Sequence, residues 1–542
     1  MTPPAKHFVV PGSVATAALL LACLSIVLLG VHLQSQVHIN HDVGWIAHSA
    51  AWLLDGRKFG TDILDPNPPM AWFLMLPVAM VVRAGLAPEI LAIQVWSWLL
   101  VCAGLALAFR ILLPLSARLG RPEVAVMLIA ATAAVSILPV GNFGQREIIA
   151  FSLLLPYQFL LTGRLLELPL PRRRLLILVG LVAGCGLCLK PFLVAVPLVT
   201  ELLHALLTRK LRVVLRAETV AMGAVVLAYM LSVLALAPGY FDYALPLIRA
   251  VYWAYDDSGY LILSRFKAAA WPAVYAIAIA IACLSVTRVH AVLLAAFTGF
   301  SVSYWAQDKG FPYHAYPILG TSCILFAYSV THAMRSILVK PLIAAAPIRM
   351  LIAILVLLIA VPVLRDPFRQ ALAWYEAGHR SDGEFGLMRQ GPIDRLRSLG
   401  IQPADYIYAF STHPNPGFPT VNYLGVHWAG RAVAQFVIPA HVRKSELTDP
   451  EVREAIDRAT GLQVEQVIAD LARYMPAYVM VEARQRRLGL AYRRFDDLAF
   501  YGKYPEFSRL WSCYEEIKPV GQVRLFRRRD VCAAGTLQKA AN

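Results

Sequence analysis

The residues best suited to chemistry lie between Val37 and Trp72, in the stretch VHINHDVGWIAHSAAWLLDGRKFGTDILDPNPPMAW. This stretch is too polar to cross a bilayer and too rich in Trp, Ile and Leu for a solvated loop. We therefore expect short amphipathic helices on the membrane surface. Asp42 directly follows an apolar run, where the headgroup of a lipid-borne substrate would lie, and a carboxylate there can accept the proton of an attacking hydroxyl. Alternatively, Asp42 caps a surface helix that begins near Val43.

Other acidic residues and one histidine accompany Asp42. His41 either tunes the acidity of Asp42 or merely stands beside it. Asp65 precedes a proline, and it either positions an acceptor or a metal or forms a turn in this proline-rich stretch. Asp62 and Asp55 are weaker candidates.

Cations in polar segments between apolar runs suggest a phosphate ligand. Arg146, Lys190 and Lys309 fall on the extracytoplasmic side of the topology derived below, against the usual charge bias. An anionic phosphate headgroup would explain them, bound bidentately by Arg or by Lys as a point charge. The alternative is that these long side chains simply extend to the interface. His314, in FPYHAYP, is a further candidate hydrogen-bond donor to the phosphate.

The elements that must position these residues are membrane helices. Hydrophobic residues make up 58% of the 542 residues and charged residues only 15%, whereas a soluble protein is about half apolar and about a quarter charged. Apolar runs of about 18 residues or more recur along the chain, which is the length that spans a bilayer. The net charge of +16 is concentrated in short loops between these runs. This is the positive-inside pattern, and it does not indicate a nucleic-acid partner.

Lys and Arg in the loops predict about eleven transmembrane helices, with the N-terminus inside and the C-terminus outside. Met70 to Leu86 is interpreted as an interfacial or re-entrant helix, because it is short and Arg83 interrupts it. The expected spans are residues 11–33, 89–109, 124–140, 148–161, two between 175 and 207, 219–237, 268–286, 290–305, 318–333 and 350–364.

This topology predicts one extracytoplasmic site, because it places every unusual polar cluster on the same face. The clusters are His41-Asp42, Asp62 with Asp65, Gln145-Arg146-Glu147, Lys190, Asp256-Asp257, and Gln307-Asp308-Lys309 with His314.

After Arg365 the composition becomes polar, which predicts a transmembrane catalytic domain (1–365) and an extracytoplasmic α/β domain (366–542). In the second domain, residues 451–471 have helical periodicity, and residues 406–410, 478–481 and 520–526 read as strands. Cys513 and Cys532 would form a disulfide if this domain is extracytoplasmic.

The chain resembles the GT-C membrane glycosyltransferases, in style closest to the protein mannosyltransferases and the bacterial aminoarabinose lipid A transferases. A first span is followed by acidic residues on an external surface helix. Next comes a glycine with Phe or Tyr three residues later and Asp six residues later, and then a Pro-Pro pair. These features are His41-Asp42, Gly56 to Asp62, and Pro68-Pro69. The likeness covers roughly the first 170 residues.

The resemblance implies a GT-C fold with juxtamembrane helices in the first external loop. It also implies an inverting transfer of sugar from a polyprenyl phosphate to a hydroxyl of a glycan, lipid or protein. The location would be the outer face of the bacterial inner membrane.

Carried over by position, the family's first acidic pair corresponds to His41 and Asp42. This leaves one acid and weakens a metal role, so no cofactor is expected and a metal stays the alternative. Asn67 stands where the family often has Lys before Pro-Pro. Lys58, Arg146 or Lys190 would replace that contact with the donor phosphate. Glu147 is the equivalent of the second family acid.

Two alternatives come from other classes. A lipid or glycan transporter would show repeats across its halves, and none is visible. An O-antigen ligase-like enzyme would use a diphosphate-linked donor.

Overall fold

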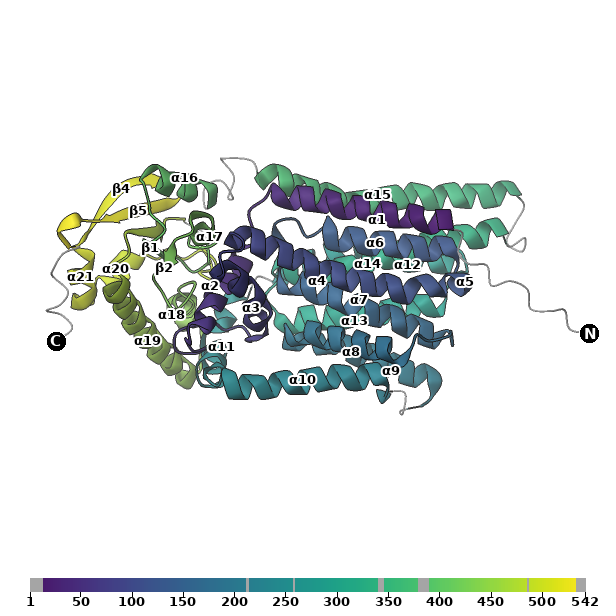
Figure 1. Cartoon of the computed structure of the whole chain (residues 1–542), viewed down its shortest axis with the longest axis horizontal. Coiled ribbons are helices and arrows are strands. Elements are labelled where there is room, and N and C mark those ends of the chain that lie inside the picture. Colours follow the sequence, from purple (N-terminus) through teal and green to yellow (C-terminus); the bar gives the residue numbers. More distant parts are fainter. Residues whose placement is uncertain are drawn as a thin grey trace, which may run out of the picture.

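The structure is a computed structural model that describes residues 13–210, 214–256, 259–339, 346–378, 389–484 and 487–532. A bundle of roughly parallel helices carries a smaller α/β domain at one end (Figure 1). Within the described residues, nine helices are long and apolar enough to cross a membrane. The chain is therefore a polytopic membrane protein, as the sequence predicts.

The bundle accounts for all the expected spans, though two of them are short. Helices α6 and α8 have 16 residues each, about 24 Å of rise against a hydrocarbon core of about 30 Å. They are therefore not among the nine, but they lie alongside the others (Figure 1). Helix α9 has only 14 residues, but it continues the 3-10 turn Pro191–Val194, and together they form an 18-residue span. The bundle helices are α1 (Ser13–Ser35), α4 (Glu89–Leu112), α6 (Arg121–Ser136), α7 (Arg146–Leu165), α8 (Arg173–Cys188), α9 (Ala195–Thr208), α10 (Ala217–Leu236), α12 (Gly259–Ala282), α13 (Arg288–Gln307), α14 (Tyr316–Val339) and α15 (Ala346–Gly378).

The stretch after α1 forms two short helices at the domain end of the bundle, α2 (His41–Leu54) and α3 (Met70–Arg83). Helix α3 has only 14 residues and contains Pro77, so it is too short to span. Trp45 and Trp72 are fully buried between these helices and their neighbours. This burial explains the aromatic content of a segment that does not cross the membrane.

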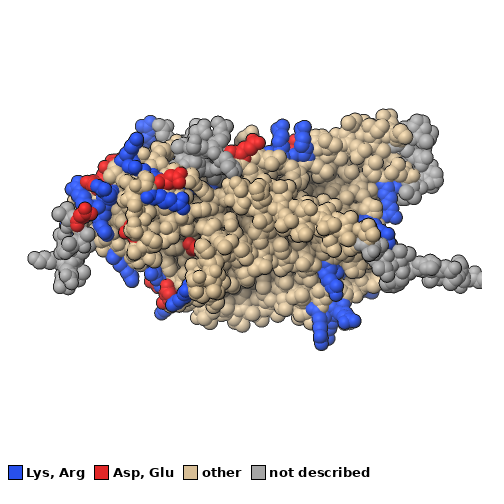
Figure 2. Space-filling model, turned by 45° about the horizontal axis from the view of Figure 1, so that its top comes forward, with Lys and Arg blue, Asp and Glu red and all other residues tan. Residues whose placement is uncertain are grey.

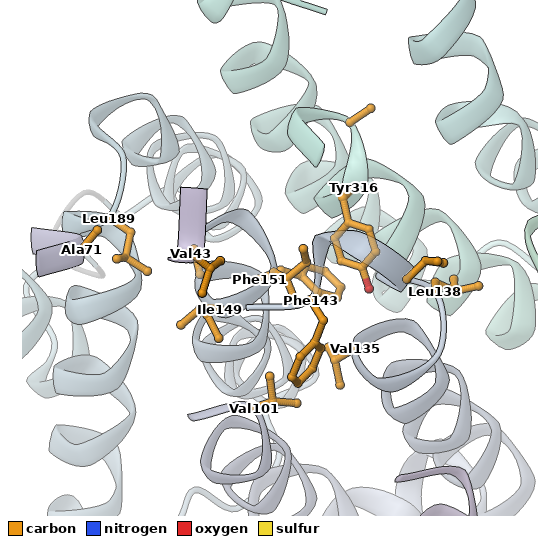
Figure 3. Close-up of a cluster of buried hydrophobic side chains, with 14 of the residues drawn as sticks. Val43, Ala71, Val101, Val135, Leu138, Phe143, Ile149, Phe151, Leu189 and Tyr316 are labelled. Atoms are coloured by element: carbon orange, nitrogen blue, oxygen red, sulfur yellow. The ribbon is translucent and has the colours of Figure 1, made fainter. Parts of the chain in front are cut away.

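Helix α7 is the central element of the bundle. It packs against α4, α8, α13 and α14, and nearly all its residues are buried. Figure 3 shows part of the apolar core, where Val43 of α2 lies next to Ile149 and Phe151 of α7 and Ala71 of α3 lies beside Leu189. The start of α7 is thereby fixed with respect to α2.

Charge separates the two ends of the molecule. In Figure 2 a broad uncharged surface lies between a domain end with both signs of charge and a far end where only Lys and Arg are visible. The exposed Arg172, Arg173 and Arg174 lie just before and at the start of α8. This is the pattern expected of a cytoplasmic face.

The C-terminal domain contains a five-stranded sheet in the order β2-β1-β3-β5-β4. Strands β1 (Tyr406–Phe410), β3 (Tyr478–Glu482) and β5 (Val523–Arg528) confirm the three expected strands. Strands β2 (His427–Trp428) and β4 (Tyr514–Val520) were not expected. Strand β1 pairs in parallel with β2 and β3, and β5 is antiparallel to β3 and β4.

Helix α19 (Pro450–Tyr474) contains the expected helix. Cys513 and Cys532 form the expected disulfide. Helix α15 continues to Gly378, past residue 365, where the composition changes. The remaining helices of the domain are α16 (Gly391–Ser398), α17 (Thr420–Leu424), α18 (Ile438–Arg443), α20 (Asp497–Tyr501) and α21 (Pro505–Trp511).

Candidate active site

A cavity of about 950 Å³ lies where the bundle meets the C-terminal domain. Its bundle side comes from the start of α2, the α2–α3 linker, the start of α7, and parts of α12, α14 and α15. Its other side comes from the C-terminal domain, including His413 and Arg484. Asp42, His41, Asp65 and Arg146 all line it, so four of the expected site residues meet in one space.

Asp42 is held in place but remains open to the cavity. Helix α2 begins at His41, and the side chain of Asn40 caps it by accepting a hydrogen bond from the Asp42 backbone N–H at 2.9 Å. The alternative that Asp42 is the cap is therefore wrong. Its Oδ2 accepts a hydrogen bond from Gln145 Nε2 at 2.9 Å, and its side chain is 20% exposed.

Asn40 and Gln145 connect two helix starts. Asn40 Nδ2 donates to the carbonyl of Gly141 and to Asn142 Oδ1, and its Oδ1 accepts from Gln145 Nε2 at 2.8 Å. The beginnings of α2 and α7 are therefore bridged directly. Sequence reasoning did not use Asn40, although an asparagine just before an amphipathic helix is a recognised cap signal.

Arg146 is the first residue of α7 and lies next to Asp42. Its Nη2 is 3.9 Å from Asp42 Oδ2. Its Nε and Nη1 are buried and have no hydrogen-bond partner within the described residues. Buried guanidinium N–H groups normally have an acceptor, so this cation is arranged to receive an anion.

Asp65 both forms a turn and lines the cavity. Its Oδ1 accepts from the backbone N–H and the side-chain amide of Asn67 at 2.7 and 2.8 Å, and its Oδ2 accepts from Trp45 Nε1 at 2.8 Å. The residue is only 2% exposed, and burial raises the pKa of its carboxyl to about 6, although these hydrogen bonds and Arg146 oppose the shift.

Glu147, Lys190 and His314 come together, but outside the cavity wall. Lys190 forms an ion pair with Glu147, lies 2.8 Å from His314 Nε2 and donates to Gln307 Oε1 at 2.9 Å. Burial lowers the pKa of Lys190 to about 8, although Glu147 opposes this shift. The charges of Lys190 and Glu147 therefore compensate each other, and neither side chain lines the cavity that Arg146 faces.

The other two expected cations occupy different positions. Lys309 pairs with Asp256, which lines the cavity, and its ammonium lies 4.7 Å from the centroid of the Tyr252 ring. Lys58 is exposed and does not line the cavity, and its backbone N–H donates to Asp62. Asp257 lies outside the described residues.

Several residues of the cavity wall were missed by sequence reasoning. They are arginines and a histidine, mostly from the C-terminal domain, and no local motif marks them: Arg265, Arg389, His413, Arg443, Arg484 and Arg487. Across the described residues, no group of three or more His, Cys, Asp or Glu side chains is arranged to hold a metal ion.

Comparison with known proteins identifies the fold. No family model and no curated protein sequence matches the chain. Among solved structures, the crystal structure of ArnT from Cupriavidus metallidurans in the apo state is similar, with a TM-score of 0.52 and 12% identity. The match covers 97% of this chain and 100% of that one. The likeness is one of fold, and it agrees with the polytopic helical bundle and C-terminal α/β domain expected from the sequence.

Proposed function

We propose that this chain, which has the GT-C fold, is an inverting membrane glycosyltransferase. It would move a sugar from a polyprenyl-phosphate donor to a hydroxyl of a cell-envelope glycan, lipid or protein. The supporting observation is the arrangement of Asp42 and Arg146, a carboxylate and an incompletely partnered guanidinium 3.9 Å apart in one cavity.

The reaction divides between these two side chains. The acceptor hydroxyl loses its proton to Asp42 as its oxygen attacks the anomeric carbon. The bond between that carbon and the phosphate oxygen breaks, and its electron pair leaves with the phosphate. Attack from the face opposite the phosphate inverts the configuration. Arg146 stabilises the charge on the leaving group, which therefore needs no general acid.

Two further buried carboxylates of the bundle do not favour the transporter alternative. Glu201 and Glu218 are paired with Arg216, and Glu218 also binds Arg164. A coupled transporter usually needs an ionisable group that can change partners within the membrane, and these carboxylates already have cationic partners.

We place the reaction on the extracytoplasmic face of the bacterial inner membrane. Support comes from the charge separation in Figure 2 and from the disulfide in the domain that covers the cavity, since disulfides persist in oxidising compartments.

The test replaces Asp42 with asparagine, which keeps the shape of the side chain and removes the base. Transfer of labelled sugar from a polyprenyl-phosphate donor in detergent should fall by at least about 100-fold, while binding of the donor lipid is retained. Asp55→Asn is the matched control, because Asp55 is exposed and pairs only with Arg83 among the described residues. Near-normal turnover of Asp42→Asn, or lipid movement without release of the sugar, would refute the proposal.

A further inference from the structure

We propose that Arg389 and His413, both from the C-terminal domain, act as positioning residues that hold His41 in the tautomer whose Nε2–H faces Asp42. The C-terminal domain would then help to set the orientation of the catalytic base. This inference rests on the proposed function of Asp42.

His41 joins the two parts of the molecule. Its Nε2 lies 3.5 Å from Asp42 Oδ1, and its Nδ1 lies 3.4 Å from Arg389 Nη2. Its ring is 4.3 Å from the ring of His413, centroid to centroid. Contacts of this kind are often long before substrate binds and shorten in the reactive complex.

The partners of His41 determine its tautomer. A guanidinium can only donate hydrogen bonds, so the Nδ1 that faces Arg389 must be an acceptor. In a neutral imidazole the hydrogen is then on Nε2, the atom nearest Asp42. Burial and the charge of Arg389 lower the pKa of His41 well below its ordinary value, which keeps the ring neutral.

His413 supports this arrangement from the other side. Its Nδ1 accepts a hydrogen bond from the Asn415 backbone N–H at 3.1 Å, so its hydrogen is also on Nε2. Burial and the neighbouring His41 and Arg484 lower the pKa of His413 well below its ordinary value. Two neutral rings can pack at this distance with the observed interplanar angle of 59°, whereas two imidazolium ions would repel.

The neutral state of His41 matters for Asp42. Gln145 already donates to Oδ2, and a neutral Nε2–H directed at Oδ1 would fix the second oxygen. Both oxygens retain lone pairs for the acceptor proton. A protonated His41 would instead form an ion pair and weaken the base.

The C-terminal domain also forms hydrogen bonds with the backbone on both sides of His41. The Tyr423 hydroxyl accepts from the Ile39 backbone N–H at 3.2 Å, and Asn422 Nδ2 donates to the Gly44 carbonyl at 3.0 Å. Docking of the domain and placement of His41 are therefore parts of one interface.

The test compares two amides at position 41. Glutamine places an N–H where His41 has Nε2, and asparagine places it nearer Nδ1. We expect His41→Gln to keep kcat within about threefold and His41→Asn to lower kcat by roughly tenfold, the loss of one hydrogen bond to a charged group. Neither change should alter the KM for the donor more than about twofold.

Arg389→Met gives a second, independent measurement. It should also lower kcat about tenfold with an unchanged KM, and combining it with His41→Asn should cause little further loss, because both act on one contact. A rise in KM as the main effect would show that Arg389 binds substrate, and equal kcat for both amides would remove the tautomer role. Either result overturns the inference.

The two proposals fail in different ways. Full activity of Asp42→Asn would show that Asp42 is not the base. If Asp42→Asn is inactive but His41→Asn and Arg389→Met keep the wild-type kcat, only the positioning role is refuted.

Discussion

Two carboxylates that line the cavity, Asp42 and Asp65, differ in exposure and in hydrogen bonding. The Asp42 side chain is 20% exposed and, among the described residues, accepts one hydrogen bond, from Gln145. Asp65 is 2% exposed and accepts three hydrogen bonds, two from Asn67 and one from Trp45. A buried carboxylate whose oxygens already have partners leaves no room for an incoming hydroxyl, whereas a partly exposed one does. The geometry therefore favours Asp42 as the base and Asp65 as the residue that shapes the linker.

The titration of Asp65 gives a prediction of pH dependence. Its pKa in the native protein is about 6, above about 3.9 in an unfolded chain. The native state therefore holds this proton more tightly, and the resulting stabilisation is complete below about pH 4 and lost as the pH rises through about 6. The melting temperature of wild type minus that of Asp65→Asn should fall across this range and level off above it. A flat difference in thermal unfolding in detergent would contradict the prediction.

At the scale of elements, α7 decides where the cationic side of the site lies. Arg146 is its first residue, and α4 packs closely along the helix below it. The close packing of α4 against α7 depends on Gly104 of α4, because a Cβ there would be 2.4 Å from the carbonyl oxygen of Ser152 on α7. A glycine far from the cavity therefore helps to set the position of Arg146.

Gly104→Ala should accordingly disturb both stability and activity. The added methyl forces α4 and α7 apart, at a cost of about 1–3 kcal/mol, and should lower kcat/KM. The matched control is Gly223→Ala on α10, where a Cβ would meet nothing within 4 Å. The control should be neutral or stabilising by up to about 1 kcal/mol. Thermal unfolding and transfer assays on both variants check this. Equal changes in melting temperature and in kcat/KM for the two variants would contradict the role of the contact between α4 and α7.

At the scale of the whole molecule, the cavity depends on two parts of the chain. The bundle supplies Asp42 and Arg146, and the C-terminal domain supplies His413 and other residues of the opposite wall. A short parallel bridge between Leu64 and Ala432 joins the α2–α3 linker to the domain. Neither part would enclose the reacting groups alone, and exclusion of water strengthens electrostatic stabilisation.

The disulfide offers a test of the state of this domain. The structure pairs Cys513 with Cys532 and leaves six cysteines free. Denatured protein purified without reductant should therefore react with six equivalents of a thiol reagent, and reduced protein with eight. Reduction should also destabilise the domain by about 2–4 kcal/mol. Mass spectrometry counts the labels, and eight labels before reduction would contradict the pairing.

The sequence alone was sufficient for the membrane helices, the surface segment after α1, three strands and the disulfide pair. These features follow from local composition and period, because a run of apolar residues must be buried or meet lipid wherever it lies. The grouping of the polar clusters at one end also followed, since each Lys- or Arg-rich loop fixes the side of the next polar turn.

Only the tertiary structure decided which of these groups reach the cavity. Lys190 and Arg146 are equally conspicuous in the sequence, but Lys190 is paired with Glu147 while Arg146 keeps unpartnered nitrogens within the described residues. The contact between His41 and Arg389 joins residues 348 positions apart. Ion pairs and tautomers depend on distances of a few ångströms between distant segments, and no local pattern of residue types carries that information.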